Sequence, residues 1–309
     1  MLAWLAWAAA PAQAESARAR HVRIASERGP IHVWAPARYD ASTAGIVVYV
    51  HGYYIGVDVA WKHHRLARQF ADSGQNALFI ACEAPRGPSE PIAWGSLAEL
   101  LATVAEKLDE LLPEGPVVAI GHSGAHRTLS AWLDADGADS GGPDVIVLLD
   151  AMYGGMRQLR EWLDAAPGRR LLDAAALTRR QSEALYADLS EVLVLDGFPS
   201  PRTRALPGAR DARVVYVRSQ FGHMQLVTSG VAIPMLLRAI QMRSGGPPAT
   251  DQDRSNDRSV SAPQGTSNHR RDRRPAIPAR RPRAWFVHGA GRRAGLRARR
   301  AAGRSRTLP

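Results

Sequence analysis

A serine, a histidine and two aspartates have the types and the chain order that nucleophilic catalysis needs. Ser123 lies in "VVAIGHSGAHRTL", where an apolar, β-branched run stops at Gly121 and small residues flank the serine. A serine hydroxyl is a weak nucleophile until a base takes its proton, and His223 in "VVYVRSQFGHMQLV" is a candidate for that base. A carboxylate must then orient the imidazole, and either Asp150 or Asp196 can supply it.

The segments around these residues alternate between strand and helix patterns. Buried-type strands are predicted at 45–50, 76–81, 116–120, 144–149 and 212–217, and helical spacing at 60–73, 96–112, 125–134, 156–165, 171–190 and 226–240. Near the start, "HVRIAS" and "IHVWAP" flank "ERGP" and predict a hairpin. This alternation predicts an α/β fold, with a mostly parallel sheet covered by helices on both faces.

The predicted elements put Ser123 on the turn between a central parallel strand and the helix that follows it. Ligands of α/β sheets bind at the carboxyl ends of the strands. The first amides of the following helix point back at this turn, where they can stabilise a negatively charged oxygen. Small neighbours on both sides allow the strained backbone that a serine needs on so tight a corner.

This segment resembles the nucleophile elbow of the α/β-hydrolase superfamily, G-x-S-x-G. It is written here as Gly121-His122-Ser123-Gly124-Ala125, with alanine in place of the last glycine. The resemblance is at the level of the superfamily and covers residues 20–243. It implies the α/β-hydrolase fold for this segment, with Ser123 as the nucleophile.

The strand at 45–50 ends in His51-Gly52-Tyr53, which resembles the "HG" that follows the third strand in the same superfamily. The residue after that glycine donates its backbone N–H to the oxyanion in the family. The resemblance therefore implies an oxyanion hole made by the backbone N–H groups of Tyr53 and Gly124.

The superfamily places its base in a loop after the last strand, which implies that His223 is the base. Asp150 ends the strand "DVIVLLD" at the edge of the sheet that Ser123 faces, and we favour it as the acid. Asp196 in "VLVLDGFP" is the competitor, because "VLVL" could form an extra strand. Either residue preserves the order serine, acid, histidine.

We do not expect the neighbouring histidines to act as the base. His122 and His126 lie beside the serine, where we expect them to line the site. His51 is expected to be structural, and His63 and His64 to lie on a surface helix.

The resemblance implies acyl transfer to water, with a small-molecule ester as the default substrate and amides or peptides left open. No Cys/His spacing suggests a metal site, so we expect neither a metal nor another cofactor. The segment 151–211 is expected to replace the usual lid, with Tyr153, Met156, Trp162 and Tyr186 lining a pocket or lying in the core. The alternative function is a catalytically inactive binding module on the same fold.

The charge of the chain is divided unevenly along its 309 residues. Residues 244–309 contain sixteen Arg, no Lys and four Asp, a net charge of +12, whereas the rest of the chain carries −1. That Arg-, Pro- and Gly-rich segment has no apolar periodicity, and we predict a disordered tail. Because the folded part is almost neutral, we expect no specific nucleic-acid partner.

The first residues resemble a signal peptide. "MLAWLAWAAAPAQA" combines a short apolar core with a small-x-small end, so we predict a cleaved signal over residues 1–14 and export of the protein. The apolar core is too short to span a membrane, and no other run is long enough. Cys82 is the only cysteine, so the chain cannot form an intrachain disulfide.

Overall fold

The computed structural model describes residues 18–136, 142–203 and 205–242. The predicted signal peptide (1–14) and the predicted tail (244–309) lie outside the described residues. The two segments therefore stay predictions.

The described residues alternate between strands and helices much as the apolar pattern predicts. The strands are β1 (Arg20–Ile24), β2 (Ile31–Ala35), β3 (Gly45–Val50), β4 (Ala77–Cys82), β5 (Val117–His122), β6 (Val145–Leu149), β7 (Arg170–Ala175), β8 (Val192–Leu195) and β9 (Val214–Arg218). The helices are α1 (Val57–His63), α2 (Leu66–Ser73), α3 (Leu97–Leu108), α4 (His126–Asp136), α5 (Met156–Ala165), α6 (Arg179–Tyr186), α7 (Gln225–Thr228) and α8 (Ala232–Arg238), with short 3-10 turns η1 (Ser123–Ala125) and η2 (Pro201–Thr203).

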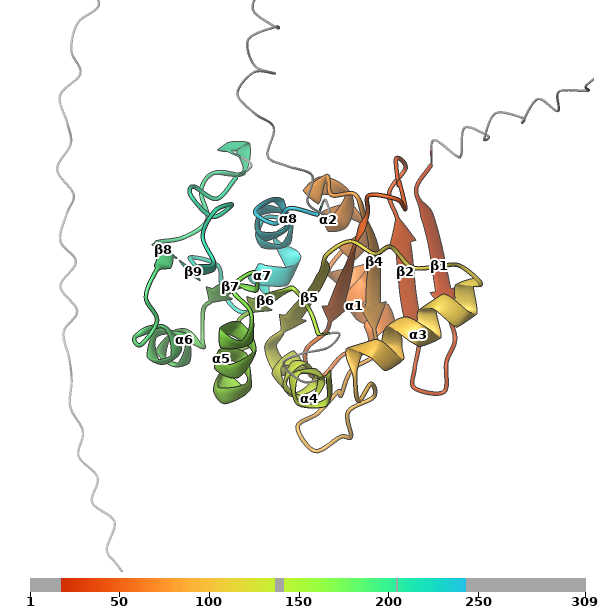
Figure 1. Ribbon diagram of the computed structural model, residues 1–309, viewed down its shortest axis with the longest axis horizontal. Helices are drawn as coiled ribbons and strands as arrows, with labels where there is room; N and C mark the ends of the chain where they lie inside the picture. The colour runs from red at the N-terminus through yellow and green to blue at the C-terminus, as the bar shows by residue number, and fades with distance from the viewer. Residues whose placement is uncertain (1–17, 137–141, 204, 243–309) are drawn as a thin grey trace, which may run out of the picture. The chain divides into compact units, whose positions relative to one another are not determined.

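The strands of the described residues form one sheet in the order β1-β2-β4-β3-β5-β6-β7-β9-β8 (Figure 1). The pairs β1–β2 and β2–β4 are antiparallel, and the other pairs are parallel. The predicted hairpin is the β1–β2 pair, with Ile24 opposite Ile31. The mostly parallel α/β fold predicted from the sequence is confirmed.

Helices cover both faces of the sheet (Figure 1). Buried side chains of α3, α4, α5 and α6 pack on one face, and those of α1, α2, α7 and α8 pack on the other. Along β3, Val48 and Val50 point to the first face, whereas Val47 and Tyr49 point to the second. Because both faces are buried, the central strands are continuous apolar runs rather than alternating ones.

One predicted helix is wrong. The segment 171–190 was expected to be helical, but it begins with β7, which pairs with β6 on one side and β9 on the other. Helix α6 follows only at Arg179. The strand is rich in Leu and Ala, which favour helices locally, and sheet pairing on both sides overrides that preference.

Two further helices are each interrupted once. The predicted helix 60–73 breaks at Arg65, whose φ of 51° is left-handed, so α1 ends before it and α2 begins after it. The predicted helix 226–240 breaks near Gly230, whose φ is 75°, between α7 and α8. The left-handed residue ends one helix and lets the chain turn into the next.

The segment 151–211 is not a lid. It contains α5, β7, α6 and β8, and β7 is an interior strand of the sheet. The loops that follow β3, β5, β6, β7 and β9 emerge at the carboxyl ends of parallel strands, so they meet along one edge of the sheet.

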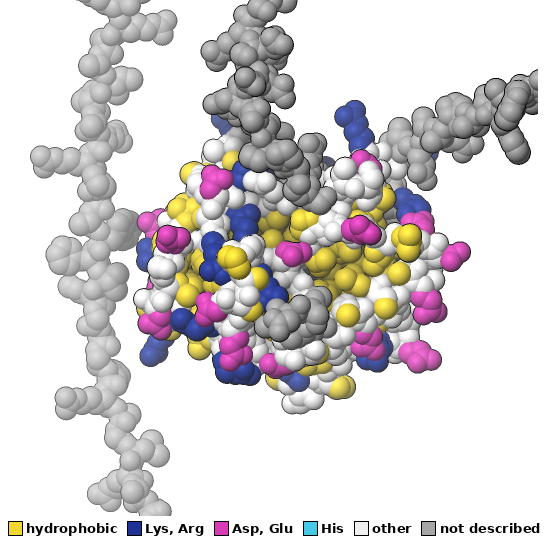
Figure 2. Space-filling model, in the orientation of Figure 1, with side chains coloured by type: hydrophobic (Ala, Val, Ile, Leu, Met, Phe, Trp, Pro, Cys, Tyr) yellow, Lys and Arg dark blue, Asp and Glu magenta, His cyan; other side chains and the backbone are white. Residues whose placement is uncertain are grey.

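Acidic and basic side chains are interspersed over the face of the molecule that Figure 2 shows. This mixture fits the nearly zero net charge of the sequence before residue 244. Within the described residues, no helix combines the length and the apolar character that crossing a membrane requires.

Candidate active site

Ser123 sits on a strained turn between β5 and α4. The strand ends at His122, the turn η1 begins at Ser123, and the φ of Ser123 is 54°. This left-handed conformation is uncommon for a residue with a side chain, and such strain is concentrated at functional sites. A Cβ at Gly121 would lie 2.6 Å from Leu129 Cδ1 and 3.2 Å from the Cβ of Ala125, so a side chain there would crowd the start of α4.

The loop after β3 lies directly against this turn. A Cβ at Gly52 would lie 2.8 Å from the Cβ of Ser123, and one at Gly124 would collide with the ring of Tyr53. The glycines therefore let the two loops touch. This contact brings Gly52 against Ser123 and the ring of Tyr53 against Gly124.

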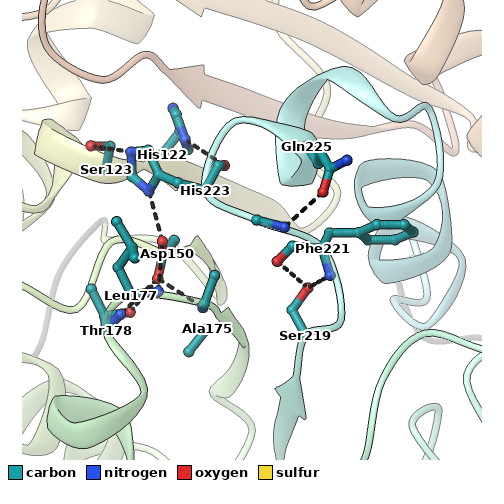
Figure 3. Close-up of polar contacts among 12 residues, drawn as sticks. His122, Ser123, Asp150, Ala175, Leu177, Thr178, Ser219, Phe221, His223 and Gln225 are labelled. Atoms are coloured by element: carbon teal, nitrogen blue, oxygen red, sulfur yellow. Dashed lines mark hydrogen bonds and ion pairs between the residues drawn. The ribbon is translucent and has the colours of Figure 1, made fainter. Parts of the chain in front are cut away.

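His223 reaches Ser123 from the loop between β9 and α7. Its Nε2 lies 2.9 Å from Ser123 Oγ, and its Nδ1 lies 2.7 Å from Asp150 Oδ2 (Figure 3). The loop is held in shape by Ser219, whose Oγ accepts from the amide of Phe221 at 2.9 Å, and by Gln225, whose Oε1 accepts from the amide of Gly222 at 2.9 Å. The histidine is thus carried on a short, hydrogen-bonded turn.

Asp150 follows β6 and is completely buried. Three amides at the start of the β7–α6 connection point at its carboxylate, those of Ala176 at 2.9 Å, Leu177 at 3.0 Å and Thr178 at 2.8 Å. The hydroxyl of Thr178 adds a fourth hydrogen bond at 2.9 Å. These contacts aim one carboxylate oxygen at His223 and fix the other (Figure 3).

The charge of Asp150 is set by competition between burial and hydrogen bonding. Burial alone would raise its pKa, but the hydrogen bonds from His223 and from the amides of Leu177 and Thr178 outweigh burial, so its pKa lies well below the usual value. An ionised carboxylate only accepts hydrogen bonds. The Nδ1 of His223 must therefore carry the proton, which leaves Nε2 free to accept the proton of Ser123.

Asp196, the competing acid, lies elsewhere. "VLVL" does form a strand, β8, at the edge of the sheet, and Asp196 follows it. Its side chain is exposed and accepts a hydrogen bond from Arg218 Nη1 at 3.1 Å. The structure thus brings Asp150, and not Asp196, to His223.

The neighbouring histidines are largely withdrawn from solvent. His122 is buried against His223, with ring centroids 4.7 Å apart, and burial together with the charges of His223 and His64 lowers its pKa to about 3. A neutral His122 does not repel a protonated His223. His126 is half-buried beside the serine, and its Nδ1 lies 3.3 Å from the carbonyl oxygen of Ser123.

His51 is buried and structural, as expected: its Nε2 accepts from the amide of Ala84 at 2.9 Å. His64 corrects the sequence prediction, because it is buried rather than on the surface. Its Nδ1 lies 2.9 Å from the hydroxyl oxygen of Tyr49, and burial, followed by nearby histidines, lowers its pKa to about 4.

Of the four residues expected to line a pocket or lie in the core, two are buried and two are exposed. Trp162 and Tyr186 are buried in the core. Tyr153 is exposed at the site, with its ring centroid 6.4 Å from that of His223. Met156 is also exposed, at the start of α5. The sequence alone could not tell which of these residues are in the core, because large apolar side chains occur at similar spacings in a core and around a site.

Among the described residues, no group of three or more His, Cys, Asp or Glu side chains is arranged to hold a metal ion.

No protein-family model and no curated protein matches this chain. Among solved structures it is similar to an esterase from Pyrobaculum calidifontis, with 18% identity over 69% of this chain and 79% of that one, at a TM-score of 0.42. It is also similar to an S-formylglutathione hydrolase from Staphylococcus aureus, with 12% identity over 72% of this chain and 98% of that one, at a TM-score of 0.46.

A third structure, an S-formylglutathione hydrolase from Agrobacterium tumefaciens, has 11% identity over 68% of this chain and 90% of that one, at a TM-score of 0.40. The order of the sheet, the elbow after β5 and the loop after β3 define the fold of this chain. The chain has an α/β-hydrolase fold.

Proposed function

We propose that this protein is a serine hydrolase that cleaves carboxylic esters through an acyl-enzyme on Ser123. The observation that carries the proposal is one continuous hydrogen-bonded chain, from Asp150 through His223 to a serine held on a strained elbow. Burial alone does not explain why a buried carboxylate, an imidazole and a hydroxyl should be aligned in this order.

The first half of the proposed reaction forms the acyl-enzyme. Ser123 Oγ attacks the carbonyl carbon of the ester while His223 Nε2 takes the hydroxyl proton, which gives a tetrahedral intermediate with a negatively charged oxygen. The intermediate collapses when the bond to the alcohol oxygen breaks, and His223 passes its proton to that oxygen. In the second half, water attacks the acyl-enzyme with His223 again as the base, and Ser123 recovers its proton.

The backbone N–H groups of Tyr53 and Gly124 are the proposed donors to the negatively charged oxygen. The contact between the ring of Tyr53 and the backbone of Gly124 supports this assignment, because it holds the two loops together beside Ser123. Loss of one such donor typically costs about 10²–10³ in kcat. Asp150 would meanwhile stabilise the imidazolium, because its carboxylate is held in the ionised form.

The test is hydrolysis of 4-nitrophenyl acetate by the purified protein and by Ser123→Ala. We expect turnover by the wild-type protein and none above background in the variant. Ser200→Ala is a matched control, because Ser200 lies on an exposed loop after β8 and should leave the rate unchanged. Absence of turnover by the wild-type protein on short esters would instead favour an inactive binding module.

A further inference from the structure

Exposed apolar side chains gather around the candidate active site. Among the described residues, eight large hydrophobic side chains are exposed, and four of them lie next to the catalytic groups: Tyr54 (85% exposed), Tyr153 (44%), Leu177 (68%) and Met224 (49%). We call these four residues the apolar rim. Half of the exposed large hydrophobic side chains thus border a single site, where binding rather than folding explains their exposure.

Each rim residue is tied to the catalytic machinery. Tyr54 follows Tyr53, and Met224 follows His223. The amide of Leu177 holds Asp150. Tyr153 lies near two imidazoles, with its ring centroid 6.4 Å from that of His223 and 6.0 Å from that of His126.

The position of His223 decides which part of an ester meets the rim. The proton on its Nε2 must reach the oxygen of the leaving alcohol, so the alcohol lies on the His223 side of the serine. Tyr153, whose ring centroid lies 6.4 Å from that of His223, and Met224, the next residue along the chain, are exposed apolar side chains beside this imidazole. This part of the rim is therefore the part that meets the alcohol portion.

The loops that carry the rim have no exposed charge. Residues 51–56, 150–155, 176–178 and 219–224 contain no Lys, Arg or Glu, and Asp150, their single Asp, is buried. Of two guanidinium groups that border these loops, Arg86 is paired with the carboxylate of Glu83, whereas Arg179 is hydrogen-bonded to the neutral carbonyl of Ser219. Within the loops themselves, a charged substrate would lose water and find no side chain of opposite charge.

From these observations we infer that the site takes uncharged esters whose alcohol portion is apolar or aromatic. This inference rests on the proposed function and adds the class of substrate. It excludes substrates with a charged alcohol portion.

The experiment compares kcat/KM for matched esters, each corrected for its rate of alkaline hydrolysis. The wild-type protein should prefer methyl 4-acetoxybenzoate to 4-acetoxybenzoate by about tenfold or more. Tyr153→Ala should lower kcat/KM for 1-naphthyl acetate by about tenfold, mainly through KM, because an aromatic contact is lost. With ethyl acetate the same variant should change by less than about threefold.

Two control variants separate binding from structure. Tyr153→Phe should retain the preference for the naphthyl ester, because it keeps the ring. Leu111→Ala should change no rate, because Leu111 is an exposed apolar residue in the loop before β5, at the other end of that strand from Ser123.

Two results would overturn the inference while leaving the hydrolase intact. They are an equal loss with naphthyl and ethyl acetates in Tyr153→Ala, and equal rates for the charged and uncharged benzoates. If no ester were hydrolysed, or if hydrolysis did not depend on Ser123, the proposed function itself would fail.

Discussion

Two aspartates one strand apart show that side chains with the same degree of burial can have pKa values shifted in opposite directions. Asp150 follows β6 and Asp173 lies within β7, and both side chains are completely buried. Asp150 accepts hydrogen bonds from three amides, a hydroxyl and His223. Asp173 Oδ2 accepts one at 3.0 Å from the hydroxyl of Tyr186, and its Oδ1 has no partner among the described residues.

The pKa values of the two carboxyl groups differ because the two carboxylates accept different numbers of hydrogen bonds. The pKa of Asp150 lies well below its usual value, whereas burial, aided by the nearby charge of Asp150, raises the pKa of Asp173 to about 7. Burial alone therefore does not decide which aspartate can stabilise a protonated histidine. The start of the β7–α6 connection supplies the donors, and only the aspartate that faces those donors can stabilise an imidazolium.

The largest effect is expected from Asp150→Asn. An amide in this position neither fixes the tautomer of His223 nor stabilises its charged form, so kcat for 4-nitrophenyl acetate should fall by about 10⁴. The rate is to be measured on protein shown to be folded by circular dichroism, because the variant also places an NH₂ group among several donors. A loss below about tenfold would mean that Asp150 is not the acid of the triad.

Asp173→Asn tests whether Asp173 is protonated in the folded protein, through the pH dependence of the free energy of unfolding. Between about pH 4 and pH 7 the unfolded chain releases the Asp173 proton while the folded protein keeps it. The free energy of unfolding should therefore fall as the pH rises through this window, by roughly 4 kcal/mol, and become independent of this group above pH 7.

In Asp173→Asn this particular decline should be absent. Urea denaturation of both proteins at a series of pH values measures the difference. Parallel pH profiles for the wild-type protein and the variant would show that Asp173 is ionised in the fold, against our account.

Thr178→Val sharpens the comparison by removing one donor to Asp150 while keeping the shape of the side chain. Loss of the hydroxyl should lower the free energy of unfolding by about 1.5–3 kcal/mol, which is typical of a hydrogen bond to a charged group. The rate with 4-nitrophenyl acetate should fall by less than about tenfold, because the three amides remain. A loss as large as that of Asp150→Asn would mean that the hydroxyl, rather than the amides, controls the charge.

Asp196→Asn should have the smallest effect. Its exposed carboxylate pairs with Arg218 on the surface, where such pairs contribute about 0–1 kcal/mol. We expect the activity to change by less than about tenfold and the midpoint of urea denaturation to stay close to that of the wild-type protein. If Asp196→Asn were more damaging than Asp150→Asn, the order of the two candidate acids would be reversed.

The sequence patterns predict most of what holds Ser123. The apolar runs 45–50 and 116–120 became β3 and β5, because each is buried on both faces and bounded by turn residues. The chain order placed Ser123, Asp150 and His223 after strands whose carboxyl ends share an edge. Their proximity could therefore be expected before any distance was known.

The rest depends on contacts between distant segments. The segment that contains β7 reads as a helix because Leu and Ala dominate it, and only pairing with β6 and β9 makes it a strand. The three amides that hold Asp150 come from the connection after that strand, so the sequence offered no sign of them. His64 was likewise expected to be exposed, since nothing local indicated its contact with Tyr49.

On the proposed mechanism, His223 activates Ser123 as the single nucleophile. The most direct test is labelling with a fluorophosphonate probe, followed by mass spectrometry of the peptides, in the wild-type protein, Ser123→Ala and His223→Ala. We predict one adduct on Ser123, none in Ser123→Ala, and labelling slowed by orders of magnitude in His223→Ala. An adduct on another residue, or undiminished labelling of Ser123→Ala, would contradict the account.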